Sequence, residues 1–179
     1  IIPYLDALTD EAKEIGAVNT ICFENNKKIG YNTDIFGFTE SLKVNSINNI
    51  KAMIIMGTGG AAKTIIHFCK KNKIPFNIVS RRKSKDYLSY RDIDHSFFKG
   101  NVLIVNCTPL GTYPDINKCP DLPYNLLEKE NILYDLVYNP SETLFIKKGK
   151  EIGCKTLNGY EMLKFQAEMS WNLWTKSLK

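Results

Sequence analysis

The chain has 179 residues, of which 44% are hydrophobic and 24% are charged, and its formal net charge is +5. These values suit one globular domain, or one domain with part of a second, and they argue against a disordered chain. The sequence has no long basic stripe and no run of about 18 apolar residues, so we expect neither a nucleic-acid partner nor a membrane segment.

The cysteines and histidines exclude several kinds of site. The five cysteines form no CxxC pair, and three of them interrupt apolar runs, which suits buried thiols better than disulfides. We therefore expect a cytoplasmic protein. The two histidines stand in no zinc-binding spacing, and no GxSxG motif occurs, so the sequence predicts no metal site and no serine nucleophile.

The first 44 residues predict two helices separated by a hairpin. Pro3 and Gly16 flank a stretch with apolar residues at helical spacing, which are ordinary start and stop signals. Asn25 and Asn26 form the turn expected between two strands. The predicted elements are a helix over 3–15, a hairpin over 18–32 and a helix over 34–44.

The rest of the chain alternates between apolar strands and helices. Strands are predicted over residues 51–57, 75–80, 101–107, 131–137 and 154–158, and helices over 61–71, 85–91, 124–130, 141–152 and 159–178. Strands that are apolar throughout and alternate with helices indicate a parallel sheet covered on both faces. The predicted fold class is therefore α/β, with a Rossmann-like doubly wound sheet.

A glycine-rich loop follows the first of these strands. The segment GTGGAA at 57–62 matches the pattern GxGxxG/A and opens a helix, which is the context that a dinucleotide site requires. Gly57 allows a tight turn, Gly59 lets the backbone approach a pyrophosphate, and Ala62 allows close packing of helix on strand. The alternative is a tight turn without a ligand. The predicted pyrophosphate-binding residues are Gly57, Thr58, Gly59, Gly60 and Ala61.

A basic cluster follows the second strand. Ser80 is followed by Arg81, Arg82, Lys83 and Lys85, where an NAD site would carry an acid for the ribose 2′-hydroxyl. A guanidinium group there can bind a 2′-phosphate with two hydrogen bonds. The alternative is a solvated basic turn, but the cluster lies where the adenosine ribose would be. The sequence therefore predicts that NADP is the cofactor.

Several further motifs flank the glycine loop in a fixed order. They are AVNT at 17–20, NTDIFGF at 32–38, NCTPLG at 106–111, DLVYNP at 135–140 and NGYEMLKFQA at 158–167. With them the chain resembles the shikimate dehydrogenases over nearly its whole length. The resemblance implies an NADP-dependent oxidoreductase that reversibly reduces 3-dehydroshikimate to shikimate in aromatic amino-acid biosynthesis.

The resemblance also assigns residue roles. It implies that Asp34 is catalytic and shares proton transfer with a lysine. The implied substrate-binding residues are Asn19, Thr33, Asp34, Tyr138 and Gln166. The implied residues of the nicotinamide end are Asn106, Thr108, Leu136, Gly159 and Met162, and those of the 2′-phosphate are Ser80, Arg81, Arg82 and Lys85.

Each role has a structural alternative. Asp34 precedes a predicted helix and could be its N-cap, and Asn19 could be a turn residue. Tyr138 could be a half-buried packing residue, and Met162 a core residue. Gln166 is an amide on an apolar helix stripe and needs a partner, which could be a polyhydroxylated ligand or a structural hydrogen bond.

One part of the family pattern is not found in these residues. The catalytic lysine and the serines that bind the substrate carboxylate stand in a segment before the position that corresponds to Ile1. We therefore expect a remnant of the substrate-binding α/β lobe over 1–33, an NADP-binding Rossmann domain over 34–157, and a helix returning to the substrate lobe over 158–179. Taken alone, the chain is expected to bind NADP without useful turnover of shikimate.

Two other functions remain open, and one kind of assembly is expected. The chain could be a stand-alone NADP-binding regulatory module, or a quinate-type dehydrogenase for another cyclic polyol acid. The apolar faces of the helices at 3–15 and 159–178 are expected to promote self-association, as in a homodimer.

Overall fold

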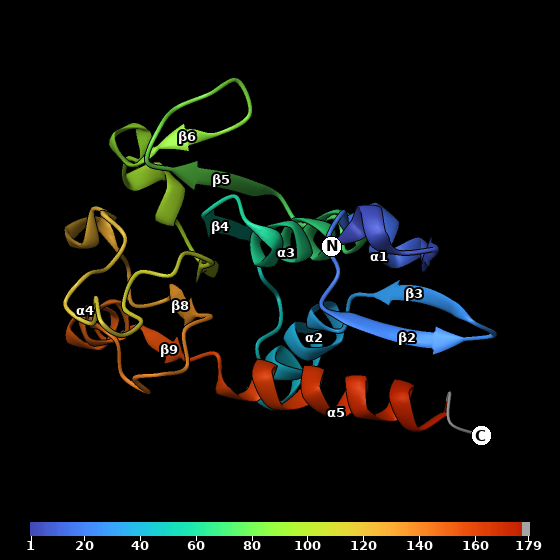
Figure 1. The fold of residues 1–179 in the computed structure, drawn as a ribbon. Helices are drawn as coiled ribbons and strands as arrows, with labels where there is room; N and C mark the ends of the chain where they lie inside the picture. The colour runs from blue at the N-terminus through green and yellow to red at the C-terminus, as the bar shows by residue number, and fades with distance from the viewer. Residues whose placement is uncertain (177–179) are drawn as a thin grey trace.

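A six-stranded parallel sheet forms the centre of the structure, a computed structural model in which residues 1–176 are described (Figure 1). Its strands are β4 (Ala52–Met56), β5 (Phe76–Ser80), β6 (Leu88–Ser89), β7 (Val102–Asn106), β8 (Ile132–Asp135) and β9 (Lys155–Leu157). The order across the sheet is β6-β5-β4-β7-β8-β9. The chain thus runs from β4 to one edge and then from β7 to the other, as in a doubly wound Rossmann sheet. The predicted fold class is confirmed.

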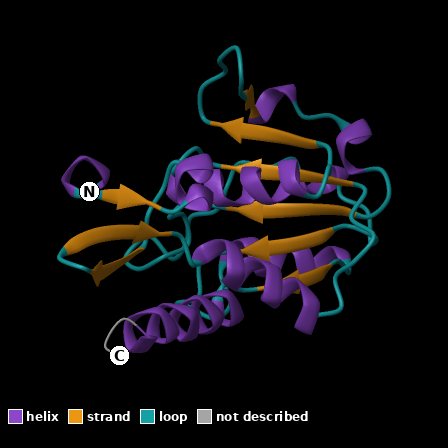
Figure 2. Cartoon of the chain, turned by 90° about the vertical axis from the view of Figure 1, so that its right-hand side faces the viewer, coloured by secondary structure: helices purple, strands orange, loops and turns teal. Residues whose placement is uncertain are grey.

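Helices cover both faces of this sheet (Figure 2). The helices of the structure are α1 (Asp10–Ile15), α2 (Asp34–Val44), α3 (Gly60–Lys71), α4 (Leu144–Ile152) and α5 (Tyr160–Lys176). Of these, α3 packs directly on β4 and α4 on β8 and β9, whereas α5 packs on α2, and α1 packs on α3 and β3. Successive side chains of a strand point to opposite faces. Accordingly, Met53 and Ile55 pack in one apolar cluster with α2, α3 and α5, whereas Ile54 and Met56 pack in a second cluster with α4. This explains why the strands are apolar throughout.

The N-terminal residues form a second, smaller sheet. Its strands are β1 (Ala7–Leu8), β2 (Thr20–Glu24) and β3 (Lys27–Tyr31), in the order β1-β3-β2. The predicted hairpin is confirmed: β2 and β3 are antiparallel, and Asn25 and Asn26 both have positive φ, which asparagine tolerates. Helix α5 runs from the large sheet towards this small one (Figure 1), where Trp174 Nε1 donates to the Ile21 carbonyl oxygen at 2.9 Å. The predicted domain boundaries stay a prediction.

Several predicted helices are shorter or absent. The stretch 3–15 contains a 3₁₀ turn (Ile2–Tyr4), strand β1 and then α1, because the Thr9 hydroxyl caps the helix by accepting from Ala12 N. Residues 85–91 do not form a helix but contain β6 and the start of a 3₁₀ turn at Tyr90–Asp92. Residues 124–130 contain only a 3₁₀ turn at Tyr124–Leu126.

Two further helix boundaries differ slightly from the prediction. Helix α4 begins at Leu144 because the Thr143 hydroxyl accepts from Ile146 N at 3.3 Å and caps it. Helix α5 begins at Tyr160, and its predicted end at Leu178 lies outside the described residues. No helix within residues 1–176 is long and apolar enough to cross a bilayer.

Candidate functional site

A cavity of about 840 Å³ opens at the carboxyl ends of β4, β5 and β7. The glycine loop forms one of its walls. Gly57 has φ +112°, and a Cβ there would lie 3.2 Å from the Cys107 carbonyl oxygen, so only glycine suits this turn. A Cβ on Gly59 would meet nothing within 4 Å, so space is open above the loop. Ligands of doubly wound sheets bind at such a point, where the strand order reverses.

The glycine loop leads directly into α3, and the start of this helix can bind an anion. Gly59 is the N-cap, and no side chain among the described residues caps the helix. The N–H groups of a first helical turn lack partners within the helix and favour a negatively charged ligand. Ala62, in the first turn of α3, is fully buried, as predicted from the motif.

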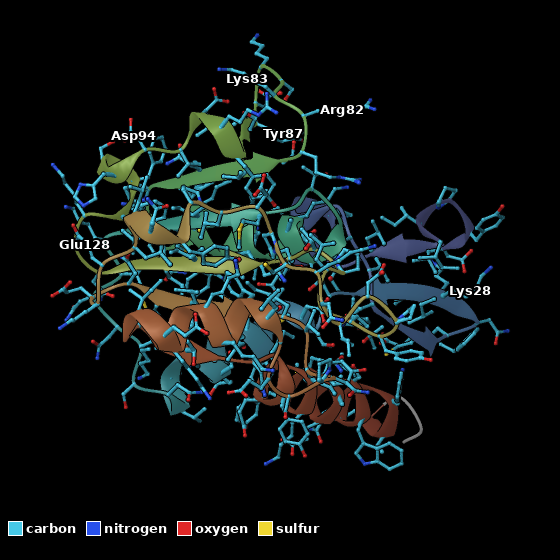
Figure 3. The ribbon with its side chains drawn as sticks, turned by 90° about the vertical axis from the view of Figure 1, so that its left-hand side faces the viewer. Lys28, Arg82, Lys83, Tyr87, Asp94 and Glu128 are labelled. Carbon is cyan, nitrogen blue, oxygen red and sulfur yellow. The ribbon has the colours of Figure 1, made fainter. Side chains whose placement is uncertain are left out.

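The basic loop after β5 forms the opposite wall of the cavity. Ser80, Arg81 and Arg82 line it, and Figure 3 shows Arg82 and Lys83 on this loop beyond the end of the sheet. Lys83 Nζ is engaged instead with Asp92 Oδ1 at 3.0 Å. Lys85 is exposed and is not among the residues that line the cavity, so its contact with a phosphate stays a prediction.

Four other residues line this cavity and were assigned no individual role from the sequence. They are Tyr90, Cys107, Pro109 and Leu110. Three of them flank the predicted Thr108 within the NCTPLG motif, namely Cys107, Pro109 and Leu110. The prediction selected only two residues of this motif, although most of it lines the cavity. Tyr90 follows β6, which was predicted as helix, so no sequence feature placed it near the glycine loop.

A second cavity of about 500 Å³ lies on the other side of the glycine loop. It shares Gly59 and Thr108 with the first cavity, and it is also lined by Gly60, Leu136 and Tyr138. The two cavities together therefore follow the loop from the basic cluster to the end of β8. Residues of three predicted motifs meet here, namely Gly60 of GTGGAA, Thr108 of NCTPLG and Leu136 of DLVYNP. This arrangement is consistent with the nicotinamide end of a dinucleotide.

Three predicted cofactor residues lie behind these walls. Asn106 is fully buried, and its Oδ1 accepts from Thr108 N at 3.0 Å and from Thr108 Oγ1 at 2.6 Å. Gly159 packs so closely on Leu136 that a Cβ would overlap the Leu136 carbonyl oxygen. Met162 belongs to the apolar core. Direct contact of these three with the cofactor stays a prediction.

A polar cluster joins the small sheet, α2 and α5. Asn19 Nδ2 donates to Asp34 Oδ1 at 2.8 Å, to Thr33 Oγ1 at 2.9 Å and, at 3.4 Å, to Gln166 Oε1. Asn19 Oδ1 accepts from Thr33 N at 2.8 Å, which fixes the orientation of the amide. Four of the five predicted substrate residues are thus in contact, although they come from three separate motifs.

Asp34 is not the N-cap of α2, so that alternative is wrong. It is the first residue of the helix, and Asn32 Oδ1 accepts from Ile35 N at 3.2 Å in the capping role. Burial raises the pKa of the Asp34 carboxyl, and the hydrogen bond from Asn19 partly offsets this rise. A carboxyl group with a raised pKa accepts and returns a proton more readily near neutral pH.

Two buried hydroxyl groups support the cluster from behind and were missed in the sequence. Ser170 Oγ lies 2.9 Å from Thr33 Oγ1 and 2.7 Å from Thr20 Oγ1. Thr33 is only 2% exposed, so it lies within the cluster rather than at its surface, and its contact with a substrate stays a prediction. Ser170 stands four residues after Gln166, on the same face of α5, which is the one signal that could have indicated it.

The residues just before Asn19 of the polar cluster lie beside the glycine loop and α3. A Cβ on Gly60 would lie 3.8 Å from the Cβ of Ala17, and Lys63 Nζ donates to the Gly16 carbonyl oxygen at 3.2 Å. Tyr138 is the exception among the predicted substrate residues, because it is half-exposed and lines the second cavity. Among residues 1–176, no three His, Cys, Asp or Glu side chains are grouped so that they could hold a metal ion.

Known proteins resemble the chain over almost its whole length. The shikimate dehydrogenase (NADP(+)) of Methanococcus vannielii is 36% identical over 98% of this chain and 68% of its own length. The enzyme of the same name from Clostridium beijerinckii is 41% identical over 97% of this chain and 67% of its own length. The chain therefore spans about two thirds of these relatives. No protein-family model matches it.

A solved structure supports the same comparison. The shikimate 5-dehydrogenase of Thermus thermophilus, in complex with NADP(H) and shikimate, has a TM-score of 0.86 to this chain at 29% identity. The match covers 98% of this chain and 68% of that one.

Proposed function

The chain belongs to the shikimate dehydrogenase family, and we propose that it provides the NADP site and part of the substrate site for the reversible reduction of 3-dehydroshikimate to shikimate. One observation carries the proposal. A cavity joins a glycine loop to two arginines, and Ala17, two residues before Asn19 of the polar cluster, lies against Gly60 of that loop. The solved relative described above binds NADP(H) and shikimate.

We propose that the first cavity holds the adenosine half of NADP. The N–H groups at the start of α3 bind the pyrophosphate, and Arg81 and Arg82 bind the 2′-phosphate. The second cavity, lined by Thr108, Leu136 and Tyr138, receives the nicotinamide end. Bound NADP supplies the hydride acceptor for shikimate oxidation.

The residues of the polar cluster then orient the substrate and move the proton. Asn19 holds Asp34 Oδ1, so the other carboxylate oxygen is directed to the substrate hydroxyl. Asp34 takes the proton of that hydroxyl as the alcohol is oxidised and returns it in the reverse reaction, for which its raised pKa is suited. Gln166 contributes amide hydrogen bonds to a ring hydroxyl. We propose the cytoplasm as the site of the reaction, a proposal supported by five free cysteines.

Cofactor titration tests the proposal directly on this chain. NADPH is expected to bind at least about tenfold more tightly than NADH, since charge-assisted bonds to a phosphate exceed about 1.4 kcal/mol. Arg81→Ala should remove most of this preference and leave NADH binding nearly unchanged. Arg91→Ala is the control, because Arg91 is exposed and does not line the cavity. Equal affinity of the unmodified chain for the two cofactors would refute the NADP assignment.

A further inference from the structure

Asp135, the last residue of β8, is a fully buried carboxylate whose hydrogen-bonding partners are all neutral. Its Oδ1 accepts from Asn106 Nδ2 at 2.9 Å and from Val137 N at 3.1 Å. Its Oδ2 accepts from Thr143 Oγ1 at 2.5 Å. The steps of proton transfer and phosphate binding described above make no use of it.

The three donors come from three segments around the second cavity. Asn106 holds the loop after β7 by accepting from both the N–H and the hydroxyl of Thr108. Val137 belongs to the segment after β8, of which four residues, 136–139, line the cavity. Thr143 caps α4 and lies against Gly111, where a Cβ would come within 3.2 Å of it. One side chain therefore connects both loops of the cavity to the start of a helix.

We propose that Asp135 is a positioning residue for the nicotinamide end of the cofactor, because its carboxylate fixes Thr108 and residues 136–139 relative to each other. The inference rests on the NADP site proposed above. It assigns Asp135 no contact with the cofactor and no step in proton transfer.

The chemistry of the neighbours explains why a polar group is needed here. An apolar side chain would avoid the cost of burying a charge but would leave the Val137 N–H without an acceptor. The Asn106 amide would keep only its bond to the Leu110 carbonyl oxygen, at 3.3 Å. Asparagine can keep both of these bonds through its single oxygen. Its amide nitrogen would then face Thr143, whose hydroxyl can accept as well as donate. Asp135→Asn should thus preserve the positions of the loops, whereas Asp135→Ala should release them.

Two ligands separate a positioning role from general loss of stability. NADPH extends into both cavities, whereas 2′,5′-ADP carries only the adenosine and phosphates of the first cavity. With Asp135→Ala, NADPH affinity is expected to fall by about tenfold, as for loss of buried hydrogen bonds, while 2′,5′-ADP affinity stays within about twofold. Asp135→Asn should restore NADPH affinity to near that of the unmodified chain.

A second buried hydrogen bond of β8 offers a matched control. Tyr134 precedes Asp135 and points to the other face of the sheet, where its hydroxyl donates to Ser41 Oγ at 2.7 Å. Ser41→Ala should lower stability without changing the ratio of the two affinities. If Asp135→Ala does not fold, Thr143→Val removes one of the three bonds, together with the cap of α4, and leaves the carboxylate in place. It should change the same ratio of the two affinities.

The outcomes distinguish this inference from the proposed function. Equal losses of affinity for NADPH and 2′,5′-ADP, or an unchanged ratio in Asp135→Ala, would overturn the positioning role while the NADP site stands. Failure of the unmodified chain to bind either ligand would instead overturn the proposed function.

Discussion

At the scale of single residues, the Asn19–Asp34 pair sets the chemistry of the proposed substrate site. Asn19 cannot turn its amide over, because its Oδ1 accepts from Thr33 N while its Nδ2 donates to Asp34. Among residues 1–176, only Asn19 donates a side-chain hydrogen bond to Asp34. The carboxyl group is therefore held at one oxygen and remains available at the other.

Asp34→Asn should abolish most turnover without unfolding the protein. It removes the proton acceptor, and loss of a positioned acid–base group typically lowers the rate by about 10²- to 10⁴-fold. The fold should be kept because Asn32, and not Asp34, caps α2. The measurement is NADPH formation from NADP and shikimate, made in the full-length enzyme that contains this chain. Thermal unfolding of the same variant is measured alongside. Asp10→Asn, at an exposed site, is the control; a rate within about threefold of the original would remove Asp34 from the mechanism.

Only part of the predicted site follows from local physical requirements, since the roles of Asn19, Asp34 and Gln166 came from the family resemblance. A glycine loop between a strand and a helix, and arginines after the next strand, could be located without any knowledge of distant contacts. Ser170 and Thr20 could not, because they meet across 150 residues of chain. Asp135 lay inside a predicted strand, where nothing in the sequence indicates which donors surround it.

At the scale of elements, the contact between α2 and α5 brings Asp34 and Gln166 together. The two helices approach closely at Gly37, where a Cβ would lie 2.5 Å from the Met162 carbonyl oxygen and 3.0 Å from Gln166 Cβ. The sequence predicted both helices from their periodicity. This contact could not be expected from the same pattern, because glycine inside a helix is usually unfavourable and its use depends on a partner.

Gly37→Ala should destabilise the protein and separate the two helices. Overpacking of a close contact typically costs about 1–3 kcal/mol, and here the obstacle is backbone, which cannot rotate away. Urea unfolding measures this loss. Gly60→Ala is the matched control, because its Cβ would meet only Ala17 at 3.8 Å, and it should leave stability unchanged or slightly higher. Similar stability of Gly37→Ala and the unmodified chain would show that the helices can part without cost.

Helix boundaries show where element prediction reached its limit. Periodicity predicted a helix over 3–15, but the Thr9 hydroxyl caps the helix and delays it to Asp10. Residues 85–91 were predicted as a weak helix, whereas Ser89 and Asp92 form a reciprocal cap around a 3₁₀ turn. In both cases a local side-chain hydrogen bond to the backbone outweighed an amphipathic pattern.

At the scale of the whole molecule, the six-stranded sheet could be predicted from the sequence more fully than the small sheet and its contact with α5. The alternation of apolar strands and helices was sufficient to predict the doubly wound sheet. The small sheet and its link to α5 depend on contacts between the two ends of the chain, such as Trp174 with Ile21. Exposed aromatic residues, including Tyr4 and Trp171, occur in this part, and self-association through them stays a prediction.

The stability of the whole molecule should depend on pH through Asp135. Burial raises the pKa of this carboxyl from 3.8 to about 6, and the hydrogen bonds from Thr143, Val137 and Asn106 offset only part of the rise. The folded protein therefore holds this proton more tightly than the unfolded chain does. The free energy of unfolding contributed by Asp135 is highest below about pH 4 and falls as the pH rises towards about 6. One pKa unit corresponds to about 1.4 kcal/mol, so the free energy of unfolding should fall by about 3 kcal/mol in total.

Comparison with Asp135→Asn isolates this contribution from those of other acids. The amide cannot ionise, so the free-energy difference between the variant and the unmodified chain should be constant below about pH 4. It should then shift in favour of the variant by about 3 kcal/mol by about pH 7, because only the unmodified chain must bury a charge there. Urea unfolding of both proteins at several pH values measures the difference. Two parallel curves from pH 4 to pH 7 would mean that Asp135 has the same pKa in the folded and the unfolded protein. The rise in pKa expected from its complete burial would then be wrong.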